Sequence, residues 1–306
     1  MPDQLSSALQ KIKSDAETFL HVEIKPRELR VEAGEDPDQV AVEVREASKL
    51  AGYFYKTQPE AYGGRPASVL ELTMLRELWA SANAPLTRYI FGPGPGLLHH
   101  AQGDLKSAYL DPLLAGTRRG AFGFTEPDNA VRPTWAVVEN DSLMITGQKS
   151  YVTGGETADF LSILVNVEDP SGKKMGTAMV VVDRTAPGVI MDSTFSSMEG
   201  GGHASFRFES VRVPLWHVVG ELGEGMPRAL ANIGNVRLMV AAEAMGMSQW
   251  AIRYVTEHLL APHRTGTPLG NKEGVRLRYA ELRIQTFAAR SVLYRAARLV
   301  DEAENS

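Results

Sequence analysis

The spacing of apolar residues changes twice along this chain, and these changes limit what it can fold into. Over residues 4–116 apolar side chains recur mainly every three or four positions, the period of an amphipathic helix. Over residues 122–214 they form short runs rich in β-branched and aromatic residues, separated by turn residues, as in an antiparallel sheet. Helical spacing returns from residue 226. We therefore expect an α+β protein, because a doubly wound parallel sheet needs helices between its strands.

Both helical parts have clear internal breaks. Gly and Pro clusters at 63–66 and 92–96 indicate interhelical loops in the first part. The second part contains one long helix that stops near Pro262 and another over residues 272–304. The apolar positions that define the first part include Val40, Val44, Ala47, Leu50, Val69, Leu72, Met74 and Leu75.

The middle part predicts a β-barrel or β-sandwich domain. Its expected strands cover residues 135–138, 143–146, 160–165, 177–182 and 204–208. The predicted organisation is an all-helical N-terminal domain over residues 1–118, a β domain over 119–222 and a C-terminal helical bundle over 223–306.

Composition excludes several kinds of chemistry. The 306 residues include no cysteine, which excludes disulfides, thiolate metal sites and a thiol nucleophile. The formal net charge of −5 gives no electrostatic footprint for nucleic acid. The seven histidines show no metal-ligand spacing, so no metal is expected. There is no signal-peptide pattern and no apolar run of the roughly 20 residues that span a bilayer, so we expect a cytoplasmic protein without a membrane span.

Two strings in the middle part stand out, GAFGFTEP at 120–127 and GQKSYVTGG at 147–155. Three further strings accompany them in order: YGG at 62–64, VRVP at 211–214 and GTPL at 266–269. With these five strings the sequence resembles the acyl-CoA dehydrogenase family over essentially its whole length. The resemblance implies FAD as cofactor and α,β-dehydrogenation of an acyl-CoA thioester as the reaction.

The two main strings have the residue types that a flavin ring requires. An isoalloxazine ring has flat apolar faces and a polar edge, so its site needs apolar walls and a few fixed hydrogen-bonding groups. Phe122, Phe124 and Tyr151 are the candidate walls, and the resemblance implies that Thr125 and Thr153 bond the flavin edge. The alternative interpretation is a strand-end turn with core aromatic residues.

Other candidate binding residues follow from the resemblance. Arg132, in a segment after the TEP turn that is shorter than in the family, supplies charge for a phosphate. Arg237 matches a family arginine that bonds the CoA portion, although a solvated or ion-paired helix face would also explain it. Arg264 lies near the family's contact to the FAD pyrophosphate and adenine. The apolar walls of the acyl pocket are expected from Phe91, Leu97, Leu98, Met239 and Val240.

The reaction needs a base that removes the α-proton of the thioester. Most relatives have this Glu in the last part of the C-terminal domain, and the chain ends at Ser306, before that part, so we expect a truncated bundle. A minority have it at the position that is Val236 here. Glu243 lies seven residues further on, nearly on the same helix face, and is the candidate base. The alternative is a carboxylate that pairs with another helix.

Three functions therefore remain open. The first is a flavin-dependent acyl-CoA dehydrogenase that passes electrons to an electron-transfer flavoprotein or a similar acceptor. The second is a non-catalytic or partner-dependent subunit of such an enzyme, and the third is a flavin monooxygenase on the same scaffold. We expect a homodimer or higher oligomer, or a hetero-oligomer with a paralogue, because the last two helices would otherwise expose the apolar residues Leu277, Leu282, Phe287 and Leu293.

Overall fold

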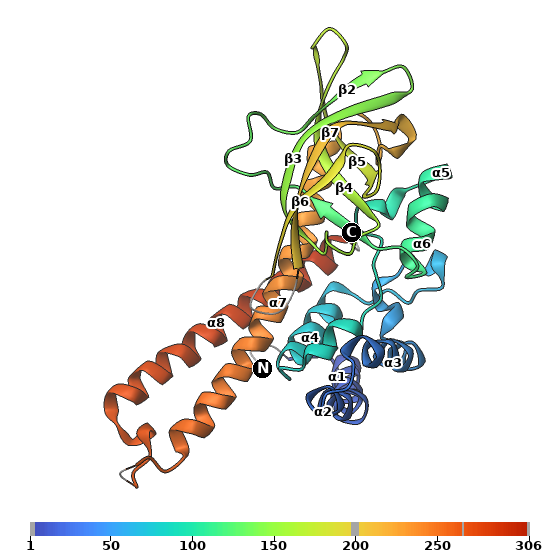
Figure 1. The fold of residues 1–306 in the computed structure, drawn as a ribbon. Helices are drawn as coiled ribbons and strands as arrows, with labels where there is room; N and C mark the ends of the chain where they lie inside the picture. The colour runs from blue at the N-terminus through green and yellow to red at the C-terminus, as the bar shows by residue number, and fades with distance from the viewer. Residues whose placement is uncertain (1–3, 197–201, 265, 305–306) are drawn as a thin grey trace. The chain divides into compact units, whose positions relative to one another are not determined.

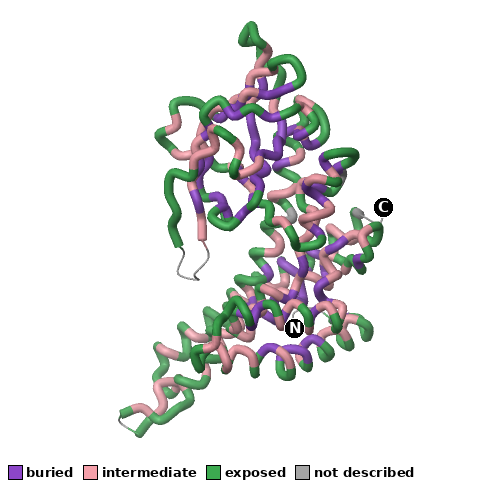
Figure 2. Tube along the Cα trace, turned by 45° about the vertical axis from the view of Figure 1, so that its right-hand side comes forward, coloured by how far each residue is buried: buried purple, intermediate pink, exposed green. Residues whose placement is uncertain are grey.

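The computed structural model of the protein describes residues 4–196, 202–264 and 266–304. The chain separates into two compact units. The β unit is Pro93–Gly234, and the helical unit joins Met1–Gly92 to Asn235–Ser306. Each unit has a hydrophobic core of its own (Figure 2). The α+β prediction is confirmed, and the three-domain partition at residues 118 and 222 stays a prediction.

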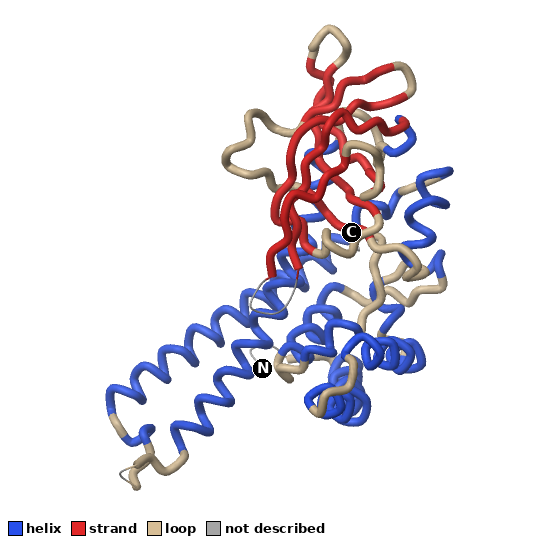
Figure 3. Tube along the Cα trace, viewed as in Figure 1, coloured by secondary structure: helices blue, strands red, loops and turns tan. Residues whose placement is uncertain are grey.

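The helical unit contains most of the helices (Figures 1 and 3). Ser6, Asp36 and Ser68 begin three of them, because each side chain accepts a hydrogen bond from a backbone amide of the first turn. The α-helices are α1 Ser7–Phe19, α2 Lys25–Glu32, α3 Pro37–Ala51, α4 Val69–Ala80, α7 Gly225–Leu260, whose first residues belong to the β unit, and α8 Glu273–Glu304. Short 3-10 or π turns are η1 Leu20–Ile24, η2 Phe54–Thr57, η3 Glu60–Tyr62, η4 Pro85–Tyr89 and η8 Leu269–Asn271.

The core of the helical unit forms where α3, α4 and α8 turn their apolar faces inward. Val40 and Val44 of α3 are fully buried, as their spacing predicts. Leu50 is 92% exposed, so its assignment to the same apolar face is wrong. Ten residues at 100° each place it about 80° away from Val40 around the helix. Other core residues are Met74, Leu75, Trp79, Tyr294 and Ala297.

Helix α8 is fastened to α4 at two points. At the start of α4, the Asp301 carboxylate accepts hydrogen bonds from the backbone amides of Val69, at 2.7 Å, and Leu70, at 3.0 Å. Further along α4, the buried Glu77 carboxylate pairs with Arg290 and accepts a 2.7 Å bond from the Tyr294 hydroxyl. Burial raises the pKa of Tyr294, and the nearby Glu77 raises it further. Asp301 thus supplies a cap to α4 from a distant part of the sequence.

Helix α7 lies close against α4 at Gly246. A Cβ built at Gly246 would overlap the carbonyl oxygen of Glu77 and lie 2.6 Å from the Cβ of Ala80. Both atoms belong to a helix that cannot yield locally, so glycine is needed for this contact. A Cβ built at Gly234 of the same helix would have nothing within 4 Å.

These two glycines give a matched stability test. We expect Gly246→Ala to lower the free energy of unfolding by about 1–3 kcal/mol through overpacking, even though alanine is the better helix former. Gly234→Ala should leave stability unchanged or raise it by up to about 1 kcal/mol. Chemical denaturation of both variants measures the difference, and equal effects would show that α4 and α7 do not pack as closely as described.

The β unit is a seven-stranded sheet with short helical turns before and after it (Figures 1 and 3). The strand order is β1-β4-β2-β3-β7-β6, and β5 pairs with β4. The strands are β1 Gly120–Gly123, β2 Trp135–Glu139, β3 Ser142–Thr153, β4 Phe160–Glu168, β5 Lys174–Asp183, β6 Val189–Ser196 and β7 Gly202–Pro214. The turns are η5 Gly96–His100, α5 Gly103–Leu105, η6 Lys106–Leu110, α6 Asp111–Leu114 and η7 Leu215–His217.

Strands β1 and β2 share one edge of β4. β5 pairs with the other edge along the whole of β4, while β1 pairs with residues 160–163 and β2 with residues 166–168. β1 therefore lies in line with β2 and beside the second half of β3, where a Cβ built at Gly123 would lie 3.4 Å from the Cγ of Lys149. This placement brings the two main sequence strings together. The sheet as a whole is curled, in agreement with the predicted barrel or sandwich.

All five expected strands are present, but two strands carry no recognisable sequence signal. β6 is largely exposed along its length, so it lacks the alternation that marks a half-buried strand. β1 has four residues, two of which are glycines. The expectation of antiparallel pairing holds for β2–β3, β3–β7, β4–β5 and β6–β7. Within the described strands, β4 pairs in parallel with both β1 and β2, so the sheet is mixed.

Candidate functional site

The aromatic residues of the first string form a partly exposed pair on β1 and the turn that follows. Phe122 and Phe124 are half-buried, whereas Ala121, which precedes them, and Gly123, which lies between them, are buried. Their ring centroids are 6.0 Å apart with planes inclined by 25°. The alternation of the strand therefore presents two nearly parallel rings on one face, followed by the exposed Thr125.

The second string contains a β-bulge. The register between β3 and β7 shifts between Lys149 and Val152, and Tyr151 has a φ of 56°. This left-handed conformation is uncommon for a residue other than glycine, and bulges of this kind re-aim side chains near functional sites. Tyr151 is 64% exposed, with its ring 5.3 Å from that of Phe195. Thr153 is also exposed.

A buried ion pair joins the two strings. The Lys149 side chain is 1% exposed, and its Nζ donates to Glu126 Oε1 at 2.6 Å and to the Phe124 carbonyl at 3.3 Å. The Ser150 amide donates to the Thr125 carbonyl at 2.9 Å. Both strings were recognised in the sequence, but Lys149 and Glu126 received no role there. The usable signal was a lysine inside a strand in which half of the residues are buried, because a buried lysine needs a partner.

The protonation of this pair follows from its surroundings. Burial alone raises the pKa of Glu126, but hydrogen bonds from Lys149 and from the Thr134 amide outweigh it and hold this pKa below its usual value. Burial lowers the pKa of Lys149, against the opposing effect of Glu126. The carboxylate is therefore stabilised in its charged form by donors that the fold supplies.

The donors and walls of this region fit a flavin ring. The hydroxyls of Thr125 and Thr153 have no side-chain hydrogen bond to any described residue, so both can bond a ligand. The hydroxyl of Ser150, inside the bulge, is buried and has no protein partner in the part of the chain that the structure describes. An apolar wall with a few uncommitted hydroxyls matches an isoalloxazine ring, whose edge carries carbonyl and nitrogen acceptors.

The arginine expected at a phosphate is committed to other contacts. Arg132 Nη2 lies 2.5 Å from Glu168 Oε1, and its guanidinium carbon lies 4.3 Å from the centre of the Trp135 ring. These contacts hold the loop after the TEP turn against β2 and β4. Binding a phosphate with Arg132 would require giving up the Glu168 pair.

The remaining predicted residues belong to the helical unit. Arg237 and Val240 are exposed on α7, and Met239 is half-buried there. Arg264 is exposed in the turn between α7 and α8. The structure therefore leaves the side chains of Arg237, Val240 and Arg264 available, and among the described residues it shows no ligand site formed around them.

Glu243, the candidate base, has an ion-pair partner. Its Oε1 lies 2.6 Å from Nη1 of Arg76 on α4, and the Glu243 side chain is 48% exposed. Its neighbours along α7 are mostly apolar. The side chain nevertheless projects toward α4 and solvent, which matches the alternative of an interhelical pair. Its role as a base stays a prediction.

One cavity includes a predicted flavin wall. It has a volume of about 250 Å³ in the β unit and contains Phe122. Leu97 and Leu98, two predicted walls of the acyl pocket, also line it, together with Phe160. Polar side chains come from Ser162 and Asn232.

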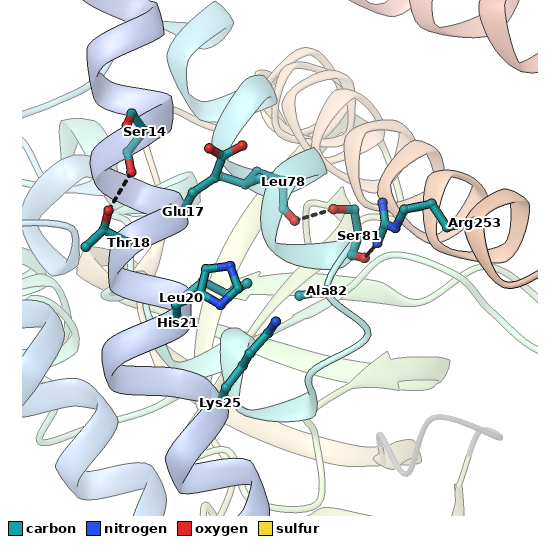
Figure 4. A pocket seen from close by; sticks show the side chains of 10 residues that line it. All are labelled: Ser14, Glu17, Thr18, Leu20, His21, Lys25, Leu78, Ser81, Ala82 and Arg253. Atoms are coloured by element: carbon teal, nitrogen blue, oxygen red, sulfur yellow. Dashed lines mark hydrogen bonds between the residues drawn. The ribbon is translucent and has the colours of Figure 1, made fainter. Parts of the chain in front are cut away.

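A cavity of about 530 Å³ in the helical unit contains none of the predicted site residues (Figure 4). His21 and Lys25 line it from one side. From α7, Arg253 donates to the backbone carbonyl of Ser81, and the Ser81 hydroxyl donates to the Leu78 carbonyl at 2.7 Å. These contacts join α7 to the end of α4, so this cavity is a cleft between packed helices.

The described residues hold neither a metal-ligand cluster nor a membrane-spanning helix. Among them, no group of three or more His, Asp or Glu side chains is arranged to hold a metal ion. Likewise, no helix in the described ranges combines the length and apolar character needed to cross a membrane.

The combination of helical segments with a curled sheet is the fold of a flavin-dependent dehydrogenase. The chain belongs to the acyl-CoA dehydrogenase family. The family description "Acyl-CoA dehydrogenase, N-terminal domain" matches residues 6–117, and "Acyl-CoA dehydrogenase, C-terminal domain" matches residues 223–306. Members of this family are FAD-dependent flavoproteins.

Individual relatives agree with this assignment. The chain is 27% identical to a cyclohex-1-ene-1-carbonyl-CoA dehydrogenase from Geobacter metallireducens, covering 92% of this chain and 76% of that protein. It is 24% identical to a short-chain specific acyl-CoA dehydrogenase from Clostridium acetobutylicum, covering 98% and 80%. A solved structure of a putative acyl-CoA dehydrogenase from Mycobacterium abscessus shares the fold, with a TM-score of 0.83 at 24% identity over 98% of this chain and 81% of that one.

The lowered pKa of Glu126 predicts a pH dependence of stability. Because this pKa is lower in the folded than in the unfolded protein, the stabilisation is present above the unfolded value of 4.5 and is lost as pH falls through the folded value. We expect the free energy of unfolding of the wild type to fall more steeply over this acidic range than that of Glu126→Gln. Urea denaturation at a series of pH values measures both slopes, and parallel curves would contradict the assignment.

Proposed function

We propose that this protein is a flavin-dependent acyl-CoA dehydrogenase that forms an α,β double bond in an acyl-CoA thioester. A base takes the α-proton, and the β-hydrogen leaves with its electron pair as hydride. When bound, FAD supplies N5 as the acceptor of that hydride. The observation that carries the proposal is the joining of the two strings, which places Thr125 and Tyr151 on linked backbone segments of a family member.

The residues of the β unit divide into two roles toward FAD. Phe122, Phe124 and Tyr151 would contact the flat faces of the ring, because their rings are partly exposed. Thr125 and Thr153 would bond its polar edge, and a donor near N5 favours the reduced ring. Arg264, exposed in its turn, is proposed for the pyrophosphate or adenine end of FAD.

The substrate proposal rests on the 250 Å³ cavity beside Phe122. At about 30 Å³ for a water-sized group, it holds roughly eight non-hydrogen atoms. This favours a short acyl group, and the relative from Clostridium acetobutylicum is described as short-chain specific. Arg237 is proposed to bond the CoA portion, with Met239 and Val240 as apolar contacts, and Arg132 to serve a phosphate if it releases Glu168.

Acyl chain length provides the direct test. We expect protein reconstituted with FAD to lose its flavin absorbance on addition of butyryl-CoA, with kcat/KM highest for short chains and at least about tenfold lower for a twelve-carbon chain that exceeds the cavity. Leu97→Trp, which fills the cavity, should raise KM for butyryl-CoA. Protein that binds FAD but is bleached by none of these thioesters would refute the dehydrogenase proposal, and a long-chain optimum would refute the cavity assignment.

Glu243 remains the proposed base, and its Arg76 partner supplies the matched control. If Glu243 is the base, Glu243→Gln should lower kcat by at least about 100-fold, because general-base catalysis is worth that much. Arg76→Met keeps the carboxylate and removes the ion pair, so it should retain most activity and cost about 1 kcal/mol of stability or less. The rate of flavin reduction in a single turnover distinguishes the two variants. A near-normal rate in Glu243→Gln would show that Glu243 serves only the pairing of the two helices.

A partner-dependent subunit is the second candidate function. The pairing of Glu243 with Arg76 and of Arg132 with Glu168 favours it, because both residues are then occupied within the chain itself. In this case the purified protein would bind FAD without turnover, and activity would appear on adding a paralogue that supplies the base.

An oligomer is proposed from the exposed faces of α7 and α8. Leu277, Leu282 and Phe287 are exposed as expected, but Leu293 is 5% exposed, so its assignment to the exposed face is wrong. Leu293 lies in the part of α8 that packs on the helical core. The exposed set favours a homodimer or a hetero-oligomer. An electron-transfer flavoprotein or a similar acceptor is the proposed redox partner.

A further inference from the structure

We propose that the buried Lys149–Glu126 pair is a positioning element for the flavin, which fixes the turn at Thr125 against the bulge at Tyr151. The inference rests on the proposed binding of FAD and deepens it. Neither residue is expected to touch the reacting atoms, so both are positioning residues.

The path of the Lys149 side chain shows why it can act this way. Its stem lies beside β1, because a Cβ built at Gly123 would lie 3.4 Å from Lys149 Cγ and 3.5 Å from its Cβ. Its Nζ reaches the turn after β1, where it bonds both Glu126 and the Phe124 carbonyl. The lysine thus ties the end of β1 to β3 through its side chain, in addition to the backbone bond from the Ser150 amide to the Thr125 carbonyl.

Glu126 in turn is fixed from a second side. Its Oε1 also accepts a 2.9 Å hydrogen bond from the Thr134 amide, at the start of β2. Thr134 is fully buried, and its hydroxyl donates to the Gln148 carbonyl at 2.9 Å. The Asn166 amide donates to the Thr134 carbonyl at 2.9 Å. The carboxylate is therefore held directly by Lys149 of β3 and by the Thr134 amide, and Thr134 is itself bonded to β3 and β4, so the turn has little freedom to shift.

The backbone beside the pair carries the flavin candidates. Thr125 precedes Glu126 and accepts the hydrogen bond from the Ser150 amide, and Tyr151 follows with its left-handed backbone. The tie therefore acts on the residues immediately before and after the pair. A ring bonded at one edge by Thr125 and contacted by Tyr151 needs both segments in fixed register.

Stability alone is a weak reason for such a pair. Removing two charges from water is costly, and an apolar pair of similar volume often stabilises a protein as well or better. The feature that an apolar pair could not reproduce is the set of directed bonds to the Phe124 carbonyl and the Thr134 amide. We infer that geometry at the turn, rather than net stability, is what the pair provides.

The test compares FAD affinity with the stability of the FAD-free protein. The variants are Lys149→Met, Glu126→Gln and the double variant, with Arg118→Met as the control. The control breaks the Arg118–Asp183 ion pair of the same unit, which lies at 2.5 Å. We expect the first three to weaken FAD binding at least about tenfold and to change the visible circular dichroism of the bound flavin, because misplaced contacts cost that much or more. Arg118→Met should leave the FAD affinity and the visible circular dichroism of the bound flavin unchanged.

The double variant separates positioning from folding. It leaves no unpaired buried charge, and the amide oxygen introduced by Glu126→Gln can still accept the hydrogen bond from the Thr134 amide. The melting temperature of the FAD-free double variant should therefore recover toward the wild-type value, while its affinity for FAD stays low. Lys149→Arg, which keeps a donor, should restore part of the affinity. Wild-type affinity and an unaltered flavin spectrum in the folded double variant would overturn the proposal while leaving FAD binding intact. A wild-type protein that binds no FAD would overturn the proposed function and this inference together.

Discussion

The β unit depends on one electrostatic requirement, which is that Lys149 must find an acceptor inside the curled sheet. A lysine with a side chain that is 1% exposed is tolerated only when its charge is paired and hydrogen-bonded. Glu126 meets this requirement, and in doing so it determines where the chain turns after β1. The position of β1, the turn and the bulge are therefore coupled features. A change in any of them would leave a buried charge without a partner.

The sequence was most informative where periodicity reflects burial. The long helices α7 and α8 were predicted to within a residue or two, because one face of each is repeatedly apolar and Pro262 lies in the break between them. β6 could not be predicted, since an exposed strand needs no alternation and is stabilised by backbone pairing with β7. The parallel pairing of β4 was equally hidden, because it depends on which strands become neighbours.

The candidate site shows the same division. The strings that contain Thr125 and Tyr151 could be recognised because local residue types identify them. The contact of Lys149 with Glu126 could not, since it joins residues 23 apart and depends on which strands become neighbours in the sheet. Glu243 shows the converse problem. Its neighbours along the helix are apolar, but the direction in which it projects brings it to Arg76 and water. Sequence neighbours therefore gave a misleading picture of its surroundings.

The bond from Asp301 to the start of α4 has a consequence for synthesis of the chain. When α4 leaves the ribosome, the acceptor for its first amides is still 232 residues away in the unsynthesised chain. Ser68 provides a local cap through the Glu71 amide, so the helix can begin to form without Asp301. The core around α4 is completed only when α8 docks, which makes a nascent chain that lacks α8 a natural client for chaperones that shield apolar surface.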